Sequence, residues 1–137
     1  MNSIQSILKT AKKTIDLERD AIANLSHLLT DDFAKAVTLI YNSKGRVIIT
    51  GIGKSAIIAN KIVATLNSTG TPAVFLHAAD AIHGDLGLIL EDDIVICISK
   101  SGNTPEIKVL VPFIKNAKNK LIAITGNDTS FLAQQSD

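Results

Sequence analysis

The stretch that decides the fold is Ile94–Glu106, IVICISKSGNTPE, in which an apolar run is followed by a loop of small hydroxyl residues and a helix start. The uninterrupted β-branched and apolar run Ile94–Ile98 is typical of a strand buried on both faces of a parallel sheet. The hydroxyls of Ser99, Ser101 and Thr104 come next, and each can donate to a phosphate oxygen. The stretch therefore predicts a buried strand that ends at a phosphate-binding loop.

The remaining residues of the loop favour the same interpretation. Gly102 allows close approach of the backbone and a positive φ. Thr104 is predicted as the N-cap and Pro105 as the first residue of a helix, whose free N–H groups and positive dipole end would face the loop. An ordinary strand-to-helix turn is the alternative, because Ser, Gly and Thr are common turn residues. Three hydroxyls in one short loop make this alternative the weaker one.

Composition limits the class of protein. The 137 residues are 46% hydrophobic but only 4% aromatic, which predicts one domain with an aliphatic core. The net charge of +1 gives no field that would attract nucleic acid. There is neither an apolar run of the ~20 residues that span a membrane nor a signal peptide, so we expect a cytoplasmic protein without a membrane partner. The only cysteine, Cys97, lies in the buried strand and is expected to be an inert core residue.

The apolar pattern divides the chain into a helical part, residues 1–42, and an α/β part, residues 46–137. Apolar residues at helical spacing predict one long helix over residues 1–30 and a second that stops at Asn42. The stripe from Ile4 to Leu29 is longer than a small sheet needs, which indicates packing against another copy of the chain.

Strands and helices alternate in the α/β part. Strands are predicted at 46–50, 73–77, 94–98 and 121–125, and helices at 55–67 and 105–117. This repetition predicts a three-layer αβα sandwich with a doubly wound parallel sheet and a ligand site at the carboxyl ends of its strands.

Four short motifs, taken in their order and spacing, resemble those of sugar isomerase (SIS) domains, in particular the bacterial D-arabinose 5-phosphate isomerases. They are GIGKS at Gly51–Ser55, STGTP at Ser68–Pro72, HGDLG at His83–Gly87 and SKSGNT at Ser99–Thr104. The resemblance covers nearly the whole chain and implies a single SIS domain over residues 1–137 with a flavodoxin-like strand order. It also implies a fifth strand and a further Glu and His, which nothing in this sequence matches, so we expect either a fragment or a member with an impaired site.

The segment Gly51–Ala56, GIGKSA, admits three interpretations. It is not a nucleotide P-loop, because Ile48 stands where that motif has its first Gly. It nominally matches the dinucleotide pattern G-x-G-x-x-A, but it lacks an acidic residue at the end of the next strand, although Asp80 is close. In the third interpretation its glycines make room for a ligand and Lys54 reaches into the cleft, since a cation at a helix start is unfavourable without such a role. The resemblance assigns Lys54 to the active-site lysine of the family.

Three more side chains are candidates for catalytic or metal-binding roles. His83 lies in a loop and can move protons near neutral pH, with a turn role as the alternative. Glu106 lies in the first turn of a helix, where the dipole alone would favour a carboxylate, and the resemblance matches it to the catalytic Glu of the family. His77 and His83 are a poor pair of metal ligands. The resemblance leaves His77 as the one candidate for zinc, and no cofactor is expected to be required.

Two functions from different classes follow. The first is an aldose–ketose isomerase that interconverts D-ribulose 5-phosphate and D-arabinose 5-phosphate through an enediol. Glu106 would move the proton, Lys54 would stabilise negative charge and His83 would assist ring opening or proton relay. The second is a module that binds a phosphosugar without turnover. We expect a homotetramer or homodimer in either case. The expected substrate-binding residues are Gly53, Ser55, Gly70, Thr71, Ser99, Ser101, Gly102 and Thr104.

Overall fold

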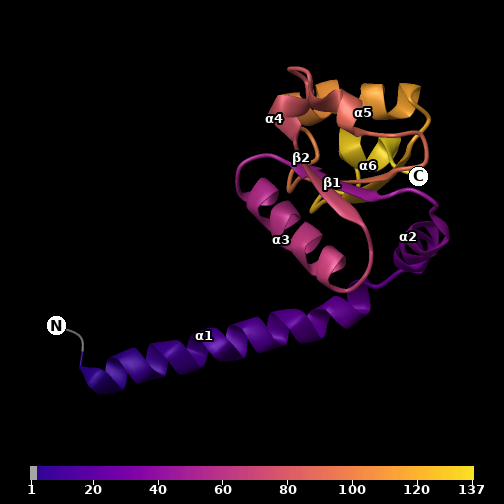
Figure 1. The fold of residues 1–137 in the computed structure, drawn as a ribbon. Helices are drawn as coiled ribbons and strands as arrows, with labels where there is room; N and C mark the ends of the chain where they lie inside the picture. The colour runs from indigo at the N-terminus through magenta and orange to yellow at the C-terminus, as the bar shows by residue number, and fades with distance from the viewer. Residues whose placement is uncertain (1–2) are drawn as a thin grey trace. The chain divides into compact units, whose positions relative to one another are not determined.

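The computed structural model describes residues 3–137, and their contacts form two units whose boundary falls within helix α2, between Val37 and Thr38. The first unit holds helices only, and the second holds the sheet with its helices (Figure 1). The elements before the boundary are α1 (Ile4–Leu25) and the 3-10 turn η1 (Ser26–Leu28), and α2 (Asp31–Asn42) spans it. The single domain expected over the whole chain stays a prediction, and the two units are described separately.

Helix α1 is shorter than the sequence predicts. Its N-cap is Ser3, whose side-chain oxygen accepts from the Ser6 N–H, and it gives way to η1 at Ser26 instead of continuing to residue 30. The Ser26 hydroxyl donates to the Ala23 carbonyl, a local bond that competes with helix continuation. Residues 1 and 2 of the predicted helix lie outside the described residues. No residue of α1 is buried, and these large apolar side chains are exposed: Ile4, Ile7, Leu8, Ile15, Leu17, Ile22 and Leu25.

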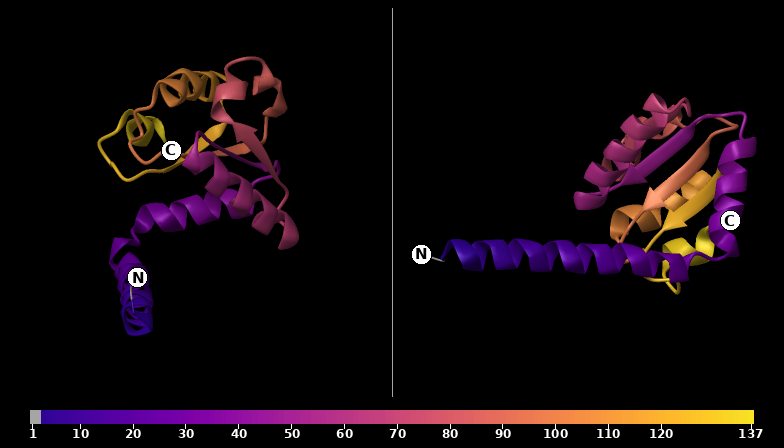
Figure 2. Two further views of the ribbon diagram at one scale, coloured as in Figure 1. Left: turned by 90° about the vertical axis from the view of Figure 1, so that its left-hand side faces the viewer. Right: turned by 90° about the horizontal axis from the view of Figure 1, so that it is seen from below.

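The second unit is built on four parallel strands in the order β2-β1-β3-β4, as the predicted doubly wound sheet requires (Figure 2). The strands are β1 (Val47–Gly51), β2 (Ala73–His77), β3 (Ile94–Ile98) and β4 (Lys120–Ile124). The helices are α3 (Lys54–Ser68), α4 (Ala78–Ala81), α5 (Pro105–Asn116) and α6 (Phe131–Gln135), with a 3-10 turn η2 (Asp85–Leu88). Predicted strand bounds are correct to within one residue, but α4 and η2 replace a predicted loop.

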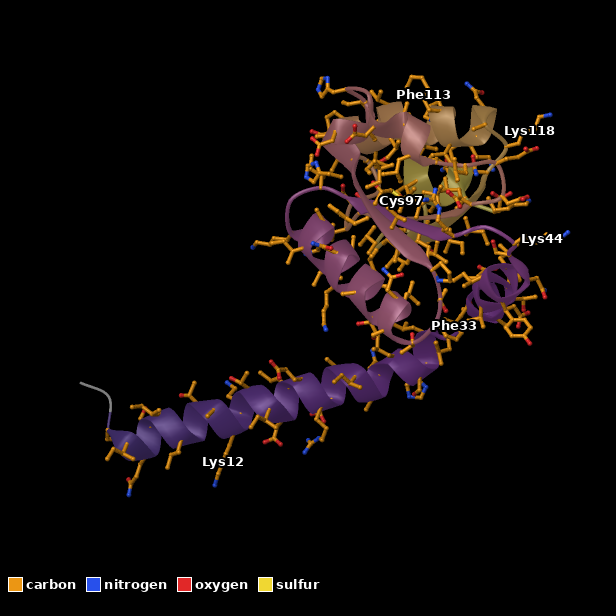
Figure 3. All side chains as sticks on the ribbon, viewed as in Figure 1. Lys12, Phe33, Lys44, Cys97, Phe113 and Lys118 are labelled. Atoms are coloured by element: carbon orange, nitrogen blue, oxygen red, sulfur yellow. The ribbon has the colours of Figure 1, made fainter. Side chains whose placement is uncertain are left out.

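The sheet is covered on both faces, which gives the three layers. Strands β1 and β3 are buried along their whole length, as their continuous apolar sequence predicts. Ile49 and Ile96 pack on the side of α3, whereas Ile48 and Val95 pack on the side of α4, α5 and α6. Cys97 lies on the second side, inside this unit (Figure 3), and burial raises the pKa of its thiol to about 12. The prediction that Cys97 lies in the core is confirmed.

The register of the strands brings their carboxyl ends to one edge of the sheet. Gly51 at the end of β1 is paired with His77 of β2 and with Ile98 of β3, and Ile98 is paired with Ile124 of β4. The chain leaves β1 toward α3 on one face and leaves β3 toward α5 on the other. Such a switch point opens a crevice between the two loops, where open α/β sheets bind ligands.

The opposite, amino edge is fixed by an ion pair. Asp93 is buried, and its carboxylate accepts from the Arg46 guanidinium at 2.7 Å, the Arg46 backbone N–H at 2.8 Å and the Leu90 N–H at 2.9 Å. Arg46 also donates to the Leu88 carbonyl at 2.7 Å. Burial alone would raise the pKa of Asp93, but these hydrogen bonds outweigh it and hold that pKa below its ordinary value.

We predict that Asp93→Asn lowers the free energy of unfolding at pH 7 by roughly 2–3 kcal/mol, somewhat less than a fully buried pair would lose, because Arg46 keeps contact with solvent. A depressed pKa in the folded state stabilises it above the ordinary carboxyl value and less as the pH falls through the folded pKa. The difference from the natural sequence should therefore shrink below about pH 4. Urea unfolding at several pH values measures this. The exposed neighbour gives the control, since Asp92→Asn should be neutral.

Candidate active site at the carboxyl edge

The candidate phosphate loop, Ser99–Thr104, is held by bonds that leave its hydroxyl protons available. The Gly102 N–H donates to the Ser99 hydroxyl oxygen at 3.1 Å, and the Asn103 N–H donates to the Ser101 hydroxyl oxygen at 3.3 Å. A hydroxyl that accepts from the backbone can still donate its own proton. The N–H groups of Lys100, Ser101 and Thr104 have no acceptor among residues 3–137. The loop thus presents several donors to an anion.

Thr104 occupies the N-cap position of α5, as predicted, but its side chain does not cap the helix. Its hydroxyl oxygen is buried and has no hydrogen-bond partner in the described part of the chain. Two other buried side-chain atoms share this condition, the Thr50 hydroxyl and His77 Nδ1. All three belong to the carboxyl edge, at the ends of β1 and β2 and the start of α5. A buried polar atom without a hydrogen-bond partner lowers the stability of the fold by about 1–3 kcal/mol. A ligand that bonds to these atoms would therefore stabilise this edge.

Gly102 cannot be replaced without disturbing the phosphate loop. Its φ is 64°, in the left-handed region. An added Cβ would come within 2.1 Å of the Ser130 hydroxyl oxygen and 2.5 Å of the Ser130 Cβ. Ser130 is itself buried at the start of α6, so it has little room to move.

The loop after β1 supplies the candidate lysine. Gly53 has a φ of 57°, and Lys54 is the first residue of α3. Lys54 is exposed, and within residues 3–137 its ammonium has no carboxylate partner. Ser55 follows in the first turn of α3, half-buried. These residues lie at the switch point, facing the phosphate loop from the neighbouring strand.

Glu106 and His83 approach this edge from two other segments. Glu106 is half-buried in the first turn of α5, directly after the phosphate loop. His83 is exposed on the connection that leaves β2, where its N–H donates to the Asp80 carbonyl at 2.9 Å. Neither side chain makes a hydrogen bond or ion pair to another residue in the described part of the chain. Both are therefore available to a ligand.

Among residues 3–137, His77 has no set of partners that would complete a zinc site, and zinc binding by His77 stays a prediction. It ends β2, its Nδ1 lies 3.8 Å from the Asp80 carboxylate, and its ring contacts Phe75 edge to face. Nowhere in residues 3–137 do three or more His, Cys, Asp or Glu side chains lie close enough to hold a metal. One imidazole and one distant carboxylate do not make a zinc site.

Gly70 and Thr71 are not brought to the site. They precede Ala73, which is paired with Val47 at the start of β1, so they lie at the amino edge of the sheet. The length of a five-residue strand, roughly 13 Å, separates that edge from the phosphate loop. The STGTP motif thus marks the turn into β2, and we leave both residues out of the site proposed for this chain.

Two residues of this edge escaped the sequence analysis. Thr50 interrupts the aliphatic run of β1 with a hydroxyl, which is the only signal that it carried. Asn103 lies inside the predicted loop, and its importance depends on a contact with Phe131, far along the chain. Sequence spacing gave no means of finding that contact.

Residues 39–137 match the SIS domain, and the chain belongs to this family. It is 48% identical over its whole length to arabinose 5-phosphate isomerase KdsD of Pseudomonas aeruginosa, and 46% identical over 96% of its length to arabinose 5-phosphate isomerase KpsF of Escherichia coli O6:H1. It covers 43% and 40% of these two relatives, so it spans less than half of their length.

A solved structure has the same fold. An E. coli CFT073 protein in complex with arabinose 5-phosphate superposes with a TM-score of 0.93 at 38% identity, over 99% of this chain and 72% of that one. The predicted family and fold class are thereby confirmed. No helix within residues 3–137 combines the length and apolar character that crossing a bilayer demands.

We predict that Gly102→Ala weakens phosphate binding more than tenfold and lowers stability by at least about 2 kcal/mol, since the left-handed φ alone costs roughly 1–2 kcal/mol. Titration calorimetry with inorganic phosphate and thermal unfolding measure the two effects. Gly87→Ala is the matched control, because an added Cβ there meets nothing within 4 Å. Unchanged phosphate affinity in Gly102→Ala would contradict the placement of the anion.

Proposed function

We propose that this chain carries the isomerase site of an enzyme that interconverts D-ribulose 5-phosphate and D-arabinose 5-phosphate. The main support is one observation: a loop with unbonded hydroxyl and N–H donors lies between the Lys54 ammonium and the Glu106 carboxylate, neither of which has a side-chain partner in residues 3–137. The names of the two curated relatives, both arabinose 5-phosphate isomerases, support arabinose 5-phosphate as one member of this pair.

The chemistry assigns one role to each group. The phosphate binds to Ser99, Ser101, Gly102 and Thr104 and to the N-terminus of α5, with Gly53 and Ser55 lining the crevice. Glu106 removes the proton from the carbon beside the carbonyl and returns it to the neighbouring carbon. Lys54 stabilises the negative charge that develops on the enediol oxygens. His83 transfers a proton during ring opening, and no step needs a cofactor.

The alternative is a module that binds a phosphosugar without converting it. A specific observation favours it: the anion site is held by many internal bonds, whereas Lys54, Glu106 and His83 have no side-chain partner in residues 3–137 that would orient them. Catalysis requires closely positioned groups, but binding does not.

We predict that Glu106→Gln lowers turnover of D-ribulose 5-phosphate at least about 100-fold while the dissociation constant changes less than about threefold, because only the base is lost. Chromatographic detection of the aldose measures turnover, and titration calorimetry measures binding. Lys54→Ala should also lower turnover without unfolding the chain. Tight binding by the natural sequence without any product would favour the binding module.

We also propose that the chain forms a homo-oligomer, a tetramer or a dimer, through helix α1. With 22 residues this helix is about 33 Å long, and its exposed apolar stripe runs from Ile4 to Leu25. A continuous strip of this kind usually marks an interface. The other proposed partner is the phosphosugar alone, in the cytoplasm.

Replacing two residues of the stripe tests this assembly. We predict that Ile15→Asp combined with Ile22→Asp yields a smaller species, because each carboxylate would be buried without a partner. Multi-angle light scattering at micromolar concentration measures the mass. Lys13→Asp, on the opposite face of the helix, should leave the mass unchanged. A monodisperse monomer formed by the natural sequence would contradict the proposal.

A further inference from the structure

The candidate phosphate loop has a second side that faces the protein. Two of its backbone carbonyls, those of Lys100 and Gly102, accept hydrogen bonds from the supporting segment, Thr125–Leu132, which follows β4. The Lys100 carbonyl accepts from the Gly126 N–H at 3.1 Å, and the Gly102 carbonyl accepts from the Leu132 N–H at 3.0 Å. Hence the supporting segment fixes the direction of peptide units in the candidate phosphate loop.

One side chain joins these two segments. Asn103 Oδ1 accepts from the Phe131 N–H, the first N–H of α6, at 3.1 Å. Asn103 Nδ2 donates to the Ser101 carbonyl at 3.1 Å, while the Asn103 backbone N–H donates to the Ser101 hydroxyl oxygen at 3.3 Å. Both ends of the amide group are therefore used, and two of the three bonds act on Ser101.

We propose that Asn103 is a positioning residue for the phosphate: it joins the phosphate loop to α6 and thereby holds the Ser101 hydroxyl and the loop N–H groups in place for the anion. The inference rests on the proposed function only in so far as the loop binds a phosphate. Asn103 acts through Ser101, since its own oxygen and one of its amide hydrogens are already bonded inside the protein.

A second asparagine provides a matched comparison. Asn67 also exchanges two hydrogen bonds with the backbone, since Nδ2 donates to the Ala73 carbonyl at 2.9 Å and Oδ1 accepts from the Ala73 N–H at 2.8 Å. It lies at the amino edge, away from the phosphate loop. Loss of either asparagine should cost similar stability, but only one of them affects the anion.

We predict that Asn103→Ala weakens binding of inorganic phosphate and of D-arabinose 5-phosphate by the same factor, roughly five- to tenfold, the effect of about one hydrogen bond to a charged group. If the chain is active, KM should rise by that factor with little change in kcat. Asn67→Ala should lower the melting temperature by a similar amount and leave both dissociation constants unchanged. Calorimetric titration and thermal unfolding measure these quantities.

A pair of variants at Phe131 tests the bond between the Phe131 N–H and Asn103 Oδ1 by changing its donor. Phe131→Pro removes the backbone N–H that donates to Asn103 Oδ1. Proline fits at this position because Phe131 is the first residue of α6 and the preceding Ser130 is extended, at φ −70° and ψ 161°. Phe131→Ala loses the same ring but keeps the N–H. We expect the proline variant to bind phosphate several-fold more weakly than the alanine variant.

The outcomes separate the two claims. Equal phosphate affinity in Asn103→Ala and the natural sequence, equal loss in Asn67→Ala, or equal affinity in the two Phe131 variants would each overturn the role of Asn103 while leaving the proposed function standing. No binding of phosphate or phosphosugar by the natural sequence would overturn the proposed function, and the role of Asn103 with it. If Asn103→Ala does not fold, the Phe131 pair decides.

Discussion

The site depends on one constraint, the in-register pairing of four parallel strands. Because Gly51, His77, Ile98 and Ile124 are aligned across the sheet, every loop that follows a strand begins at the same edge. The crossover from β1 to α3 and that from β3 to α5 then diverge to opposite faces. Residues that are about fifty positions apart in the sequence meet there, and the positive ends of two helices face the same crevice.

The same edge is where the protein tolerates unfavourable local chemistry. The Thr50 and Thr104 hydroxyls and His77 Nδ1 are buried without a hydrogen-bond partner in residues 3–137, whereas at the amino edge the buried carboxylate of Asp93 accepts from several donors. Deviations of this kind are expected where a fold has to bind something. The contrast between the two edges is independent support for placing the ligand among the loops at the carboxyl edge.

Much of the fold could be predicted from the sequence, because buried strands, helix caps and glycine turns are local signals. The strand β3 and the loop after it are the clearest example. The predicted strand at 73–77 already implies that Gly70 and Thr71, which precede it, lie at the amino edge, whereas the motif match assigned them to the ligand without regard to the direction of the strand. The sequence could not show that α1 ends at Leu25, or that Asn103 reaches Phe131, since both depend on hydrogen bonds that only the folded chain defines.

Arg46, Asp93 and the buried Asn119 tie the loops of the amino edge together, with Asn119 donating to the Leu90 carbonyl at 2.7 Å and the Asp93 carbonyl at 2.9 Å. These stabilising bonds thus lie at one edge of the sheet and the candidate site lies at the other. Residues in the loops at the carboxyl edge can be exchanged, and the ligand preference of that edge changed, without loss of the stability that the amino edge provides.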